Sequence, residues 1–388
     1  MAGPFRRRVF YIPGYDPYPP RRYREIYRRE GARQAGISGY GLHVRAQGQK
    51  WHVLADMDGA AETEVEVLVW SDIVQTSMQG GVRATYAQML RTAWIYLRSG
   101  ALRALWGVAR PPLRAAMYPV AVLLAQLLVA LLPMVLALWL LPIWAALPLG
   151  ALALAGILRL FRRHDNRFLA YYLMHDYAFT AAWQGANPPE LEERLDQFRA
   201  KIAEALESGV DEVLVVGHSS GAHLGVSILA DLLRGRGDAP QVPLGLLTLG
   251  HVVPMVSFLP EAGRLRRDLH DLSREARLTW IDVTAPGDPC TFALCDPVGV
   301  SGVAPADQRW PCILSAAFSR HMAPERWRAL RWRFFQLHFQ YLHAFEQPGI
   351  YDYFAITAGP MTLAQRFAGR ASSPQARRAA MSPHRGMS

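Results

Sequence analysis

A serine between glycines is the first feature of the sequence that could do chemistry. It lies in the run Gly217-His218-Ser219-Ser220-Gly221. A serine attacks a carbonyl only if its hydroxyl is exposed, near a base and backed by free N–H groups, and a sharp strand-to-helix turn supplies this geometry. The run therefore indicates a nucleophile elbow with Ser219 as the nucleophile.

The residues around this run favour the elbow over a plain glycine-rich loop, which is the alternative. The bare pattern arises by chance in long sequences, so its context decides. Residues 213–216 are β-favouring and precede the turn. Apolar residues at helical spacing follow it, namely Leu224, Ile228, Leu229 and Leu232.

An early strand offers a place for the second donor of an oxyanion hole. Residues 9–13 are apolar and end at Gly14-Tyr15. We expect the backbone N–H of Tyr15 to lie opposite that of Ser220. The alternative is an ordinary strand-to-helix turn with a buried tyrosine.

A carboxylate and a histidine must complete the site, in the chain order serine, acid, histidine. Asp288 lies just beyond the predicted strand 278–284, where α/β sheets keep their sites. Asp296 is the alternative acid, and Asp288 could instead be only a turn former beside proline and glycine. Asp282 lies within the strand.

The preferred base is His338, because the aromatic run 334–342 could hold its imidazole neutral and oriented. His343 and His321 are the alternatives. His343 is five residues further on, so a helix would turn it to a different face.

Four other histidines are not expected to be the base. His218 and His223 flank Ser219 too closely to reach it easily, and His251 follows a strand. His175 and Asp176 are adjacent on a predicted helix, so they do not face one site.

Strands that alternate with helices predict an α/β fold with a mainly parallel sheet. In the helix at 81–99, we expect Tyr86, Met89, Leu90, Ala93 and Leu97 to face the core. The expected strands are 9–13, 41–45, 51–54, 64–70, 213–216, 244–250 and 278–284, and the other expected helices are 20–33, 167–183, 189–208 and 261–276.

Residues 115–158 contain no Asp, Glu, Lys, Arg or His. One helix of this length would measure about 66 Å, twice the roughly 30 Å of bilayer hydrocarbon. Two spans near 118–138 and 143–160 fit better, with prolines at 133, 142 and 148 as candidate breaks. Arginines flank both outer ends, which predicts that these ends are cytoplasmic. The alternative is a buried pair of core or lid helices.

Composition supports a folded chain at a membrane. The 388 residues are 51% hydrophobic, and the net charge of +10 comes almost wholly from arginine. The basic residues form scattered clusters without a nucleic-acid motif, so a membrane surface is the expected partner. Cys290, Cys295 and Cys312 are expected to be reduced thiols, and their spacing does not suggest a metal site. We expect no cofactor.

These features together resemble the α/β-hydrolase superfamily of serine esterases and lipases. The resemblance covers about residues 5–360 without the apolar segment, and the elbow is its most specific part. The chain departs from the pattern in lacking a His-Gly pair before the oxyanion loop and in carrying an inserted hairpin. The matching residues are Ile12-Pro13-Gly14-Tyr15, the elbow, Asp288 and His338-x-x-Tyr341.

The resemblance implies a two-part hydrolase domain (1–114 and 161–360), which the apolar segment interrupts as a membrane hairpin (115–160). Residues 361–388 are rich in Arg, Ala, Ser and Pro, so we expect a disordered basic tail. The elbow beside a membrane segment predicts cleavage of an apolar or lipid ester through an acyl-enzyme, and the flanking arginines predict a catalytic domain at the cytoplasmic face of a bacterial inner membrane. Two alternatives stay open. One is a catalytically silent, hydrolase-like adaptor that binds lipid or protein, and the other is an acyltransferase that uses the same residues.

Overall fold

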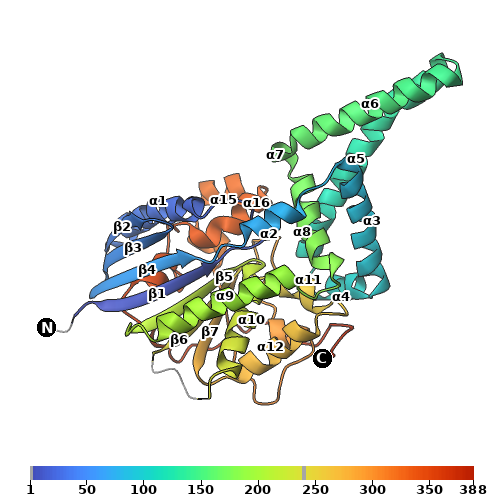
Figure 1. The fold of residues 1–388 in the computed structure, drawn as a ribbon. Coiled ribbons are helices and arrows are strands. Elements are labelled where there is room, and N and C mark those ends of the chain that lie inside the picture. The colour runs from blue at the N-terminus through green and yellow to red at the C-terminus, as the bar shows by residue number, and fades with distance from the viewer. Residues whose placement is uncertain (1–2, 238–241) are drawn as a thin grey trace.

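Eight strands form one sheet in the order β2-β3-β4-β1-β5-β6-β7-β8 (Figure 1). The structure is a computed structural model, and it describes residues 3–237 and 242–388. Neighbours from β4 to β8 are parallel, whereas β2 and β3 join the edge antiparallel. The strands are β1 (Phe5–Ile12), β2 (Gly41–Gln47), β3 (Lys50–Asp56), β4 (Ala60–Val67), β5 (Glu212–His218), β6 (Leu244–Leu249), β7 (Leu278–Thr284) and β8 (Cys312–Ser315).

The two halves of the chain meet at the centre of this sheet. β1 pairs with β4 on one side and with β5 on the other, and Ile12 lies opposite Gly217. The carboxyl ends of β1 and β5 are therefore neighbours, as a site between them requires. The prediction of an α/β fold with a mainly parallel sheet is confirmed.

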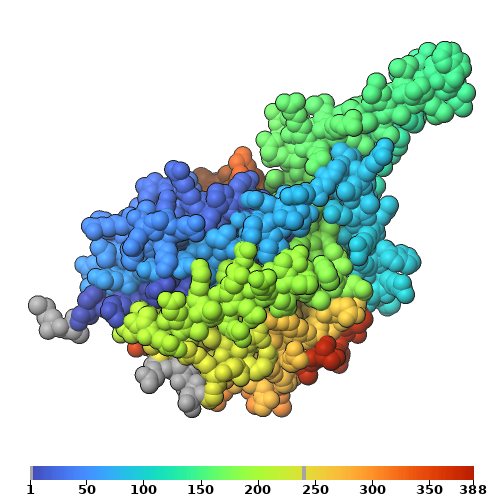
Figure 2. Space-filling model, viewed as in Figure 1, coloured from blue at the N-terminus to red at the C-terminus, as the bar shows by residue number. Residues whose placement is uncertain are grey.

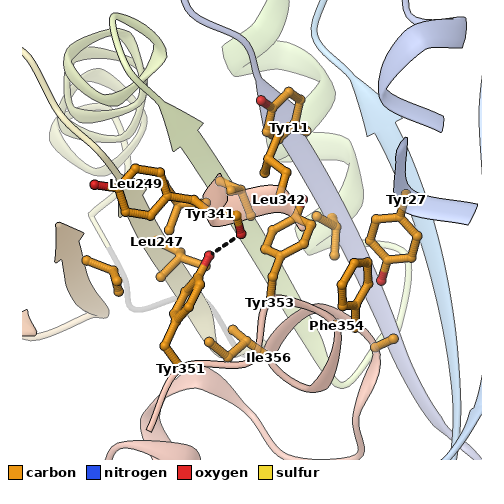
Figure 3. Packing of buried hydrophobic residues seen from close by; sticks show 14 of the residues in the cluster. Tyr11, Tyr27, Leu247, Leu249, Tyr341, Leu342, Tyr351, Tyr353, Phe354 and Ile356 are labelled. Atoms are coloured by element: carbon orange, nitrogen blue, oxygen red, sulfur yellow. Dashed lines mark hydrogen bonds between the residues drawn. The ribbon is translucent and has the colours of Figure 1, made fainter. Parts of the chain in front are cut away.

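Helices cover both faces of the sheet, so every residue of β5 is buried. One face carries α1 (Arg21–Ser38), η1 (Phe339–Leu342) and α17 (Tyr353–Ala358), whose aromatic side chains pack on β1 and β6 (Figure 3). In this cluster the Tyr351 hydroxyl donates a 2.8 Å hydrogen bond to the Tyr341 carbonyl. The other face carries α9 (Pro189–Leu206), α10 (Gly221–Arg234) and α12 (Gly263–Arg274).

The other helices of the body connect or follow these elements along the chain. They are α2 (Ser71–Ser77), α3 (Val82–Arg98), α4 (Ala101–Val108), α7 (Asp165–Phe168), α8 (Ala170–Ala182), α11 (Val253–Ser257), α13 (Pro297–Val300), α14 (Phe318–His321), α15 (Pro324–Leu330), α16 (Phe334–His338) and α18 (Leu363–Arg366).

Two apolar helices project from this body as a hairpin (Figures 1 and 2). They are α5 (Arg110–Leu140) and α6 (Ile143–Arg163), and both are long and apolar enough to cross a membrane. The expected spans lie within them, and of the three candidate breaks only Pro142 separates the helices. At the tip, Trp139 is 83% exposed and Trp144 is 77% exposed.

The tail beyond residue 361 differs from the expected disorder. It contains α18 and then follows the surface of the body. The Arg377 carbonyl accepts a 2.8 Å hydrogen bond from the Asp296 N–H, and the buried Arg266 donates to the Gly386 carbonyl at 2.6 Å. The apolar side chains of Leu363 and Phe367 are also buried in the core that includes α17, so the few apolar residues of this segment anchor it to the body.

Candidate active site

The turn between β5 and α10 holds Ser219 in a conformation that few residues adopt. Its φ is +58°, in the left-handed region. A non-glycine residue held there by its surroundings often belongs to a functional site. The Ser219 N–H donates a 2.9 Å hydrogen bond to the Leu249 carbonyl of β6, which fixes the turn to the sheet.

Close backbone contacts explain the two glycines of the turn. A Cβ on Gly217 would lie 2.5 Å from the Gly221 carbonyl oxygen. A Cβ on Gly221 would lie 2.1 Å from the Ile12 carbonyl oxygen. Only glycine allows the elbow to pack this tightly against the end of β1.

The loop after β1 lies directly against the serine. A Cβ on Gly14 would lie 2.9 Å from Ser219 Cβ and 3.2 Å from Ser219 Oγ. The loop is held by Trp70, whose indole N–H donates to the Pro13 carbonyl at 3.0 Å, and by Tyr172, whose hydroxyl donates to the Tyr15 carbonyl.

The two residues expected to donate to an oxyanion, Tyr15 and Ser220, border the same cavity as the serine. Within residues 3–237 and 242–388, neither backbone N–H donates to a protein acceptor. Both groups are therefore available to an oxygen that enters the cavity.

Asp288 and His338 form a direct pair. Asp288 Oδ2 accepts a 2.7 Å hydrogen bond from His338 Nδ1, and both side chains are buried. The other oxygen, Oδ1, accepts the Cys290 N–H at 2.9 Å. The proton of the neutral imidazole stays on Nδ1, where it is donated to the carboxylate in this hydrogen bond. Nε2 therefore keeps a free lone pair, and it is the atom that acts as the base.

Aromatic and histidine rings hold the imidazole in place. The His218 ring stacks on His338 with centroids 4.9 Å apart, and His218 Nε2 donates to the His338 carbonyl at 3.1 Å. Burial, and then the proximity of His338, lower the pKa of His218, so His218 stays neutral. Gly250, with φ of +55°, leaves room for the rings of Tyr341 and His338, since a Cβ there would lie 2.6 Å from Tyr341.

The alternative acid and bases lie in other contacts. Asp296 caps α13 by accepting the N–H groups of Val298 and Gly299. His343 bonds the Phe339 carbonyl at 2.7 Å, and His321 bonds the Gln347 carbonyl at 2.7 Å. The structure thus brings Ser219, Asp288 and His338 to one place, and gives the alternatives other partners.

A cavity opens over these residues and connects them to the hairpin. It holds about 870 Å³ of empty space, part of it open to solvent. Ser219 and His338 line this cavity together with residues of α8. The first turns of α5 add Pro112 and Ala116 to the lining. The remaining lining is mainly aromatic and apolar.

Asp176 is the site residue that sequence reasoning missed. We expected His175 and Asp176 to be structural because adjacent helical residues diverge, and they do diverge. His175 borders a different cavity, whereas Asp176 borders the one that holds Ser219. One feature of the sequence could have pointed to Asp176. Tyr172, Asp176 and Thr180 follow one another at intervals of four residues, which places them on one face of α8.

One group of side chains could in principle hold a metal ion. Asp288, Cys290 and His338 offer ligand atoms within 4.8 Å of one another. However, Asp288 and His338 already bond each other, and burial raises the pKa of the Cys290 thiol, which disfavours the thiolate that a metal needs. The arrangement fits proton transfer better than metal binding.

Comparison with known proteins finds no matching family model, no matching curated protein and no matching solved structure.

Proposed function

We propose that this chain is a membrane-anchored serine hydrolase of the α/β-hydrolase type that cleaves an apolar or lipid ester. One observation carries the proposal. His338, which pairs with Asp288 at 2.7 Å, borders the same cavity as Ser219, whose strained backbone is typical of a nucleophile elbow.

The first half of the reaction forms an acyl-enzyme. His338 Nε2 takes the Ser219 proton as Oγ attacks the ester carbonyl, and Asp288 stabilises the resulting imidazolium. The carbonyl oxygen becomes an oxyanion, which accepts the N–H groups of Tyr15 and Ser220. Collapse breaks the bond to the alcohol, which leaves with the proton from His338.

The second half releases the acid. Water attacks the acyl-enzyme while His338 takes its proton, and the proton then returns to Ser219. In the described residues the Ser219 hydroxyl makes no hydrogen bond, so the contact with Nε2 forms by side-chain adjustment as substrate binds.

The cavity lining and the hairpin support an apolar substrate. The helix α5 contributes Pro112 and Ala116 to the cavity and continues into the exposed apolar hairpin. If the hairpin crosses a bilayer, the cavity lies beside the membrane surface, where lipid esters are concentrated. Arginines at both outer ends of the hairpin favour a cytoplasmic body at a bacterial inner membrane.

Labelling with a fluorophosphonate tests the proposal, because this reagent modifies only an activated serine. The purified protein in detergent should react, and Ser219→Ala should not. A folded wild-type protein that stays unlabelled beside a reactive control hydrolase would favour the silent adaptor. Analysis of the products in the presence of an alcohol acceptor separates hydrolysis from acyl transfer.

A further inference from the structure

The cavity over Ser219 contains negative but no fixed positive side chains. Among the described residues, its lining includes Asp16 and Asp176 but no lysine or arginine. This is unusual in a chain with 42 basic residues. The local charge therefore disfavours an anionic substrate and favours a cationic one.

The two carboxylates differ in their partners. Asp16 is fully engaged, because it accepts the Tyr23 hydroxyl at 2.6 Å and the Tyr18 N–H at 3.0 Å, and Arg22 lies 3.5 Å away. Asp176 accepts no hydrogen bond within residues 3–237 and 242–388. Asp176 is thus the carboxylate that is free to meet a ligand.

The hydroxyl groups of three neighbouring tyrosines bond other atoms. The Tyr15 hydroxyl bonds Ser77 Oγ at 2.6 Å, and the Tyr96 hydroxyl donates to the Met255 carbonyl at 2.8 Å. The Tyr172 hydroxyl donates to the Tyr15 carbonyl. These three hydroxyl groups therefore do not donate to the Asp176 carboxylate.

The rings form a continuous row from the oxyanion loop to the base. Tyr15 and Tyr172 have centroids 6.2 Å apart, Tyr172 and Phe335 are 5.6 Å apart, and Phe335 and Phe339 are 5.4 Å apart. Phe339 in turn lies 6.3 Å from the His338 ring, and the Arg22 guanidinium already lies over the Phe339 ring, 4.9 Å from its centroid. The rings of Tyr15, Tyr172 and Phe335 have no such partner among the described residues. Aromatic faces attract cations, and quaternary ammonium groups above all.

Burial makes a cation at this place favourable. Asp176 is half-buried because its side chain borders the cavity, and desolvation raises its pKa from 3.8 to about 7, opposed only by His338. A lone carboxylate in this setting loses hydration without gaining a partner. A cation beside it restores the charged form.

We propose that Asp176 and the rings of Tyr15, Tyr172 and Phe335 form a subsite for an ammonium group of the substrate. This inference rests on the proposed function, which supplies the ester cleavage. It adds that the ester carries a cationic amine, as choline esters do. Asp176 is then a specificity residue and takes no part in proton transfer.

The test compares two esters of the same shape with the full-length protein in detergent. Butyrylcholine carries the cation, and 3,3-dimethylbutyl butyrate replaces its nitrogen by carbon. The wild type should prefer the cationic ester by about 10- to 100-fold in kcat/KM, mainly through KM. Asp176→Asn should reduce this ratio to near one while changing kcat/KM for the neutral ester less than about threefold. The exposed Asp196→Asn on α9 serves as the matched control.

A binding measurement tests the subsite independently of the hydrolase proposal. Choline should bind Ser219→Ala in calorimetry, and adding Asp176→Asn should weaken this binding at least about tenfold. If the protein binds choline through Asp176 but hydrolyses neither ester, the subsite stands and the hydrolase proposal fails. A wild-type ratio near one, a ratio unchanged in Asp176→Asn, or no choline binding would overturn the subsite.

Discussion

In the proposed reaction Ser219 and His338 act only together, and this dependence gives the first prediction. Ser219→Ala and His338→Ala should each lower kcat/KM for a short ester by about 10⁴-fold or more, and the double variant should be little worse. Asp288→Asn should retain more activity, because the carboxylate orients the imidazole rather than reacting. Esterase assays and labelling measure all four variants.

The alternative acid and base serve as controls. His343→Ala and Asp296→Asn should stay active, since these residues bond the Phe339 carbonyl and the N-terminus of α13 instead. Each variant needs a check of folding, because a lost buried hydrogen bond also costs about 1–3 kcal/mol. A folded His338→Ala protein with normal turnover would move the base elsewhere.

Gly14 gives a second prediction, based on space rather than on chemistry. In Gly14→Ala the new Cβ would lie 2.9 Å from Ser219 Cβ, so the serine or the loop must shift. A displacement of this kind should lower kcat/KM by about 10- to 100-fold. Gly36→Ala is the matched control, because nothing lies within 4 Å of its Cβ. Equal activity of Gly14→Ala and wild type would show that the loop is free to move.

At the residue scale, the sequence led to the elbow and to its partners but not to Asp176. Ser219, Asp288 and His338 were found because their order and their position after strands follow from topology. Asp176 was missed because its importance depends on where α8 packs and on where neighbouring tyrosine hydroxyls point. Neither is encoded in local spacing.

At the element scale, β1 is tied to β5 and to the C-terminal segment by Arg7. Its guanidinium pairs with Glu212, and both side chains are at most 1% exposed. It also donates to the Gly359 carbonyl at 2.8 Å.

Arg7→Ala should therefore destabilise the fold strongly. Removing one partner of a buried pair leaves the other charge without compensation, at a cost of about 3–5 kcal/mol. The exposed Arg28, which pairs with Glu25 on the surface of α1, provides the comparison, and Arg28→Ala should change the free energy of unfolding by less than about 0.5 kcal/mol. Denaturant unfolding followed by tryptophan fluorescence measures both. Similar stabilities of the two variants would contradict a structural role for the buried pair.

Sequence patterns located most elements but not all of their faces. Strongly apolar strands such as β5 and β6 were predicted, whereas the short β8 was not, because four residues carry little periodic signal. In α3 the expected core residue Met89 is buried, but Leu90 and Leu97 are exposed, and Thr92 and Tyr96 are buried instead. The packing of α3 on α8 determines which residues of α3 are buried. The hydrophobic pattern of the α3 sequence, which precedes the apolar hairpin, does not reveal that contact.

At the scale of the whole molecule, the sheet constrains how the chain can meet a membrane. β1 precedes the hairpin and β5 follows it, yet their backbones are hydrogen-bonded neighbours. The parts of the chain before α5 and after α6 must therefore lie on the same side of any bilayer. The apolar part of α6, residues 143–158, is about 24 Å long, and Arg159 can extend to the interface.

The last prediction follows from this constraint and from the arginines at the base of the hairpin. A reporter active only in the cytoplasm should be active at both ends of the chain. A reporter active only outside the cytoplasm should be active when inserted between Leu141 and Pro142, where α5 and α6 meet. A tip that is inaccessible from either side would mean that the hairpin dips into the bilayer without crossing it. An exported reporter at one end alone would be incompatible with the shared sheet, because β1 and β5 cannot pair across a membrane.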